Sequence, residues 1–158
     1  LIPENLEGLV SLTFFDIHEN QVSNVPKSLL ELPRLKRLYL SRNDITKVPE
    51  ELEVQDGLIE LEFHSNKIPS LPGCFEKLLN LSDLSISNNQ ISTIPDHISN
   101  LTRLWSVHIG NNQFPEIPAC FYNMDWLIRL NLYGNNIRVI EPKIGCMMQL
   151  RKLCLCYN

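Results

Sequence analysis

Asparagine recurs in this sequence at a fixed interval of 23 residues, and this interval sets the architecture. The seven positions are Asn20, Asn43, Asn66, Asn89, Asn112, Asn135 and Asn158. Chance does not place seven residues of one type in register along a whole chain, so the sequence is built from a structural repeat. A repeat this short cannot bury its apolar face alone and must stack on its neighbours. The period therefore predicts a solenoid.

The same apolar spacing precedes each asparagine. Leu35, Leu38 and Leu40 precede Asn43, which gives the pattern L-x-x-L-x-L-x-x-N. The L-x-L alternation predicts a short strand with one face buried and the other in water. The asparagine follows where the chain turns inward, and its amide can donate to and accept from buried backbone groups. We therefore expect a structural role for all seven asparagines.

The second half of each repeat carries a proline, as in Val48-Pro49 and Ile94-Pro95. Proline lacks a backbone donor, so this arm cannot be a strand of the sheet. An extended step followed by a 3₁₀ or helical turn is expected on the outer, convex side. Departures from the pattern are few: the sixth repeat has Ile140-Glu141-Pro142 in place of Ile-Pro, and in the third register Gln55 stands where leucine is expected. We expect the neighbouring Val54 to take that place in the core.

These motifs resemble the leucine-rich repeat family over the whole chain. The 23-residue unit is similar to the intracellular class found in Ras-pathway scaffolds, Scribble-type polarity proteins and plant Ras-group repeat proteins, and to the cytoplasmic repeats of volume-regulated anion channels. The resemblance implies a right-handed α/β solenoid, a horseshoe with a parallel inner sheet and irregular or 3₁₀ convex arms. It also implies a binding module without catalytic activity, whose strand face receives the partner.

The repeat covers residues 1–158 as a single domain of about seven units. The pattern opens on a convex arm at Ile2-Pro3 and closes on Asn158, directly after a strand. We therefore expect a fragment of a longer protein, cut within a repeat at both ends.

Composition narrows the partners and the compartment. Lys plus Arg is 14 and Asp plus Glu is 18, a net charge of −4 that gives no general attraction to nucleic acid or anionic membrane. The sequence has no apolar run of the ~18–20 residues that would insert into a membrane. Its five cysteines are odd in number and lack zinc spacing, so we expect reduced thiols and a cytoplasmic protein. Sequons at Asn80 and Asn100 leave an extracellular location open.

The alternation also predicts which side chains face the concave solvent. They are Phe14, Asp16, His18, Arg37, Tyr39, Ser41, Glu60, Glu62, His64, Asp83, Ser85, Ser87, Ser106, His108, Gly110, Arg129, Asn131, Tyr133, Lys152, Cys154 and Cys156. An acidic centre lies beside a basic step, and a second basic region lies at the end of the series. The acidic residues are Glu60, Glu62 and Asp83, the basic step is Lys36, Arg37 and Arg42, and the basic end is Arg129, Arg151 and Lys152. Such a bipolar face can orient a partner of complementary charge, or it can simply keep a long sheet soluble.

Aromatic residues on this face favour partner binding, because Tyr and Trp are enriched among interface hot spots. The residues that we predict to contact a protein partner are Arg37, Tyr39, Glu60, Glu62, His64, Trp105, His108, Arg129 and Tyr133. No small-molecule substrate, cofactor or metal is expected.

Catalysis is not expected, because the sequence contains none of the phosphate-loop, dinucleotide, nucleophile-elbow or zinc-protease motifs. Glu60 and Glu62 share a strand face, but an open sheet does not supply the desolvation that tunes a carboxylate pair. The sequence predicts a protein-interaction module acting as a scaffold or adaptor in signalling. Two alternatives stay open: an architectural segment of a cytoskeletal or ciliary assembly, and an extracellular recognition ectodomain.

Overall fold

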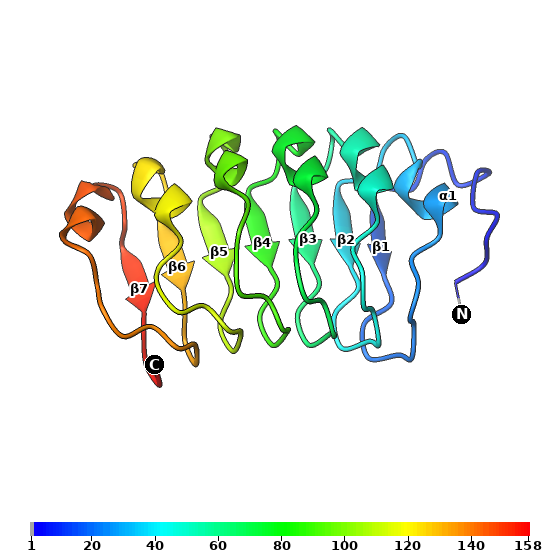
Figure 1. The fold of residues 1–158 in the computed structure, drawn as a ribbon. Helices are drawn as coiled ribbons and strands as arrows, with labels where there is room; N and C mark the ends of the chain where they lie inside the picture. Colours follow the sequence, from blue (N-terminus) through cyan, green and yellow to red (C-terminus); the bar gives the residue numbers. More distant parts are fainter. Residues whose placement is uncertain (1) are drawn as a thin grey trace.

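The L-x-L segments form short parallel strands in the computed structural model, which describes residues 2–158. The seven strands found there follow one another in a single sheet in chain order (Figure 1). Every strand pairs in register, so that each residue lies beside the residue 23 positions further along. Their bounds are β1 Phe14–Asp16, β2 Arg37–Tyr39, β3 Glu60–Glu62, β4 Asp83–Ser85, β5 Ser106–His108, β6 Arg129–Asn131 and β7 Lys152–Cys154.

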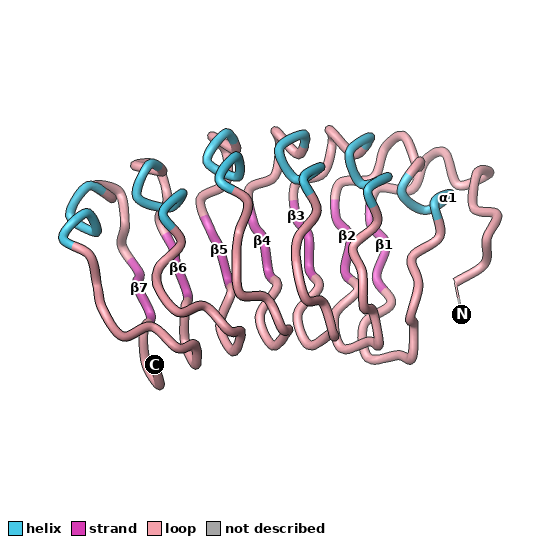
Figure 2. The backbone as a smooth tube through the Cα atoms, viewed as in Figure 1, coloured by secondary structure: helices cyan, strands magenta, loops and turns pink. Residues whose placement is uncertain are grey.

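The arms between the strands form a second row of short helical turns. The first is a single α-helical turn and the others are 3₁₀ turns, as expected on the side away from the strand face (Figure 2). Most begin directly after the recurring proline, which is extended and cannot donate to the sheet. They are α1 Lys27–Leu30, η1 Glu50–Val54, η2 Gly73–Lys77, η3 Asp96–Asn100, η4 Ala119–Asn123 and η5 Pro142–Cys146.

One continuous apolar core lies between the sheet and these turns. The central residue of each inner strand is fully buried, for example Leu38, Leu61 and Leu84. Phe75 and Phe121 fill the space behind them from the helical turns. No helix among residues 2–158 is both long and apolar enough to cross a membrane.

The recurring asparagines close the repeats as expected. The Asn112 amide donates to the carbonyls of Ile86, Ile109 and Gly110 at 3.0–3.3 Å, and its Oδ1 accepts from the Ile91 N–H at 3.0 Å. Asn43, Asn66, Asn89 and Asn135 make the same four bonds. Each therefore ties its own repeat to the preceding one.

The expectation for Gln55 and Val54 is wrong. Gln55 itself takes the core position and is only 4% exposed, whereas Val54 lies 55% exposed on the outer side. The burial of the Gln55 amide is compensated, because its Nε2 donates to the carbonyls of Leu30 and Leu32. A polar side chain can thus replace leucine there because the preceding repeat presents two acceptors to it.

Candidate protein-interaction face

The face of the sheet opposite the core carries the nine side chains predicted to contact a partner. Arg37, Glu60 and Arg129 open their strands, and Tyr39, Glu62 and His108 close theirs. His64 and Tyr133 follow two residues after strand ends, and Trp105 directly precedes β5. All nine are exposed or half-buried. The structure thus gathers these residues along one face, and their contact with a partner stays a prediction.

Three small residues expected to face solvent are buried instead. Ser41 is 1% exposed, Ser106 is fully buried and Gly110 is buried as well. Strands lie about 4.8 Å apart, so a small residue is covered by the longer side chains on both neighbouring strands. The Ser106 Oγ lies 3.1 Å from His108 Nε2, whereas the Ser41 hydroxyl has no hydrogen-bond partner among residues 2–158.

Contacts between neighbouring strands order the part of the face around β1–β3. The Arg37 Nε donates to Glu60 Oε1 at 3.0 Å, and the Tyr39 hydroxyl donates to Glu60 Oε2. The Phe14 ring meets the Tyr39 ring edge-on at 5.0 Å. Burial, together with the hydrogen bond to Glu60, raises the pKa of Tyr39 above its ordinary value. Tyr39 is therefore a neutral, fixed part of the surface.

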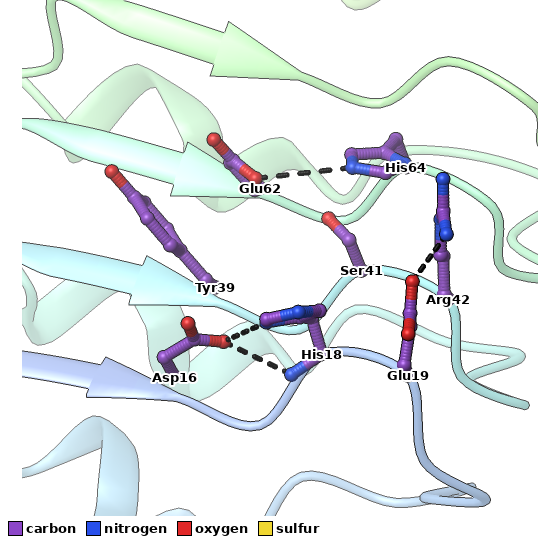
Figure 3. A pocket seen from close by; sticks show the side chains of 8 residues that line it. All are labelled: Asp16, His18, Glu19, Tyr39, Ser41, Arg42, Glu62 and His64. Carbon is purple, nitrogen blue, oxygen red and sulfur yellow. Dashed lines mark hydrogen bonds and ion pairs between the residues drawn. The ribbon is translucent and has the colours of Figure 1, made fainter.

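A hollow of about 380 Å³ opens beside this group (Figure 3). Ser41 and Tyr39 of the central repeat lie between two walls of similar composition. The Asp16–His18 pair forms one wall and the Glu62–His64 pair forms the other. We call this site the Ser41 hollow. It exists because serine lies between two larger residues in the same row.

The two histidines of the Ser41 hollow have opposite environments. The His18 ring is exposed and its Nδ1 lies 2.8 Å from Asp16 Oδ1, and this hydrogen bond raises the pKa of His18. Burial lowers the pKa of His64, and the positive charge of Arg42 lowers it further. Arg42 is itself paired with Glu19 at the rim. The two histidine rings therefore gain their protons at different pH, His18 at a higher pH than His64.

Glu62 lies between the Ser41 hollow and a second hollow of about 420 Å³, which also exposes Glu60, Asp83, Trp105 and His108. Burial raises the pKa of Glu62, and the carboxylates of Asp83, Glu60 and Asp16 raise it further. Its nearest basic group is His64 at 3.9 Å, and no Lys or Arg among residues 2–158 pairs with it. The centre of the face is therefore acidic and incompletely compensated.

The part of the face around β5–β7 is basic and aromatic. The Arg129 guanidinium lies 5.0 Å from the centre of the Trp105 ring, in a cation–π contact. Tyr133 meets Tyr157 edge-on at 5.3 Å. Arg151 and Lys152 line a third hollow of about 370 Å³ with Arg129. The bipolar charge distribution expected from the sequence is present.

The cysteines of the described chain are all free thiols. Burial raises the pKa of Cys74 and of Cys120 to about 12, so neither is a thiolate near neutral pH. Cys154 ends β7 and Cys156 follows two residues later, with their sulfurs 3.7 Å apart. Among residues 2–158, no three His, Cys, Asp or Glu side chains are grouped as a metal site would require.

The sequence-based contact set omitted several residues that shape the face, chiefly Asp16, His18 and Ser41. A signal for the ion pairs was present in the repeat. Residues 23 apart are direct neighbours, and Arg37–Glu60, Glu19–Arg42 and Asp44–Lys67 are opposite charges at this separation. The 23-residue separation therefore predicts all three ion pairs.

Family models and solved structures match this architecture. A leucine-rich repeat family model matches residues 57–114, and a second one matches residues 34–54. A leucine-rich repeat protein of Leptospira interrogans is 28% identical, with a TM-score of 0.94, over 98% of this chain and 39% of that one. The plant peptide hormone receptor RGFR1, solved in complex with RGF2, is 27% identical with a TM-score of 0.77, over 98% of this chain and 30% of the receptor. Comparison with curated proteins gave no significant match.

The parallel sheet, the asparagine row and these matches define a repeat solenoid of the kind that binds other proteins. The chain is a leucine-rich repeat protein. It spans about two fifths or less of the length of the two solved structures.

Proposed function

We propose that this chain is a non-catalytic protein-interaction module of a cytoplasmic scaffold or adaptor, which presents its strand face to a protein partner. Leucine-rich repeat proteins generally mediate protein–protein interaction. The observation that carries the proposal is the composition of this face: aromatic anchors at Tyr39, Trp105 and Tyr133 alternate with an acidic centre and a basic end.

Rigidity supports the same function. The in-register sheet and the asparagine row fix the spacing of surface groups, and Tyr39 and Trp105 are each held by a neighbour. A surface that is ordered before binding loses little conformational entropy when the partner arrives. Complementary charge at the two parts of the face would then set the orientation and the association rate.

The test is a pull-down from native lysate with the full protein, followed by mass spectrometry. A variant with Tyr39→Ala, Glu62→Lys and Trp105→Ala is compared with a control that carries Val54→Ala, Leu79→Ala and Glu51→Lys on exposed positions away from the strand face. We expect both variants to remain folded in a thermal melt and only the first to lose a partner. If the control loses that partner and the first variant keeps it, the convex arms hold the interface.

The extracellular alternative has one supporting comparison, the plant receptor. Its test is the sequon at Asn100, which is exposed at the end of η3, whereas the Asn80 side chain is held by Asp56 and Arg103. A glycan on Asn100 of the native protein would favour the ectodomain. Salt-resistant co-purification in a large particle would favour the architectural segment.

A further inference from the structure

The Ser41 hollow contains two groups whose bonding capacity is unused. The Ser41 hydroxyl is buried, has no hydrogen-bond partner among residues 2–158, and is directed toward the side of the hollow where Glu62 lies (Figure 3). The Glu62 carboxylate is half-buried without a Lys or Arg partner in the described chain. A buried unpaired hydroxyl and a partly desolvated carboxylate each cost free energy. A ligand that satisfies both would recover that cost.

The charges around the hollow select a cation. Asp16, Glu19 and Glu62 line it together with a single guanidinium, that of Arg42. Arg42 is already engaged by Glu19, and Asp16 by His18. Glu62 therefore faces the hollow with its negative charge available, and the neighbouring carboxylates add to the negative potential there.

The shape and the acceptors favour a guanidinium over an ammonium. Glu62 and Ser41 lie on neighbouring repeats, and a planar guanidinium can donate to a carboxylate and a hydroxyl at once through its fork of N–H groups. The Tyr39 ring borders the same space and can contact a cation. The protein already uses these two contacts elsewhere on this face, in the Arg37–Glu60 ion pair and the Arg129–Trp105 contact.

We propose that the Ser41 hollow binds one arginine side chain of the protein partner, paired with Glu62 and donating to the Ser41 hydroxyl beside the Tyr39 ring. The proposal rests on the proposed function, because it assumes that a protein docks on the strand face. It specifies the chemistry of that partner: a segment with an exposed arginine that is positioned for the β1–β3 part of the face.

The test is a titration of the protein with N-acetyl-arginine methylamide, followed by NMR signals of the His18 and His64 rings. We expect saturable shifts with a millimolar dissociation constant, weaker binding of the lysine analogue and no binding of the uncharged citrulline analogue. Glu62→Gln should weaken arginine binding about tenfold, as loss of a charge-assisted bond predicts. The matched control Glu76→Gln makes the same charge change in η2 and should have no effect.

Ser41→Ala separates a binding role from a structural one. Removing an unpartnered buried hydroxyl should leave the melting temperature equal or higher, while arginine binding weakens about threefold. Equal affinity for arginine and citrulline, unchanged binding in Glu62→Gln and Ser41→Ala, or no saturable shift would each overturn the proposal. None of these results changes the outcome that we expect from the pull-down comparison. Conversely, if the hollow binds arginine but the triple variant still captures the same partners, the proposed function is overturned and only the arginine specificity of the hollow remains.

Discussion

The asparagine row and the strand face are built on the same strands, yet the repeat treats them in opposite ways. At the strand ends, the same residue makes the same four bonds in one repeat after another. On the exposed face, neighbouring positions of one row read Phe14, Arg37, Glu60 and Asp83. Positions that repeat therefore carry the fold, and the positions that vary are those on which we propose that partner recognition depends.

The largest difference is expected in stability when an inner asparagine is removed. Asn112→Ala deletes four side-chain hydrogen bonds and leaves buried backbone groups unpaired. We expect the free energy of unfolding to fall by about 2–4 kcal/mol, measured by urea denaturation. Asn20 is the matched control, because it is exposed and its side chain makes only two hydrogen bonds, both within its own turn. An equal loss in Asn20→Ala would contradict the role of the bonds between repeats.

A smaller loss is expected where the pattern itself departs from leucine. Gln55→Leu restores the consensus residue but removes the donor to the Leu30 and Leu32 carbonyls. We expect a cost of about 1–2 kcal/mol in the same denaturation experiment, because a buried acceptor is left unsatisfied. A gain in stability would instead mean that apolar packing outweighs the two hydrogen bonds.

On the strand face, removing the charge of Glu62 should raise the stability of the protein rather than lower it. The raised pKa of Glu62 means that the folded state disfavours its ionised form. The folded carboxyl therefore binds its proton more readily than the unfolded one, and stability falls as the pH rises through its titration. We expect Glu62→Gln to raise the melting temperature at pH 7 by on the order of 1–2 °C. The gain should vanish below the titration range of the carboxyl, and a gain that persists there would have another cause.

The smallest expected effect is a difference between the pKa values of the two histidines of the Ser41 hollow. His18 should titrate above 6.5 and His64 below it, as followed by NMR of the ring protons. The contribution of His18 to stability is present below its unfolded pKa and is lost as the pH rises through its folded value. That of His64 is lost in the other direction, as the pH falls through its lowered pKa. Asp16→Asn should return the pKa of His18 toward 6.5, and an unchanged value would contradict the Asp16 contact.

The strands, their register and the asparagine bonds could be predicted because each follows from a period that nothing interrupts. The burial of Gln55 could not, since it depends on two carbonyls of another repeat. The Ser41 hollow was missed for a related reason. Alternation indicates that Ser41 faces outward, but its burial depends on the size of the side chains beside it. Sequence patterns thus predict direction well, whereas enclosure needs the neighbouring rows.

The asparagine row has a further consequence for how such a chain can change length. From Asn43 onward, each Oδ1 accepts from the N–H of a residue 21 positions back, and each Nδ2 donates to the carbonyl of a residue 26 positions back. A deletion or duplication of one whole 23-residue unit preserves both offsets, whereas any other length breaks the ladder at the junction. Such an event would also move the acidic centre relative to the basic end in one fixed step of about 4.8 Å. The number of repeats between the acidic centre and the basic end therefore sets the distance between them, and that distance can change only in whole repeats.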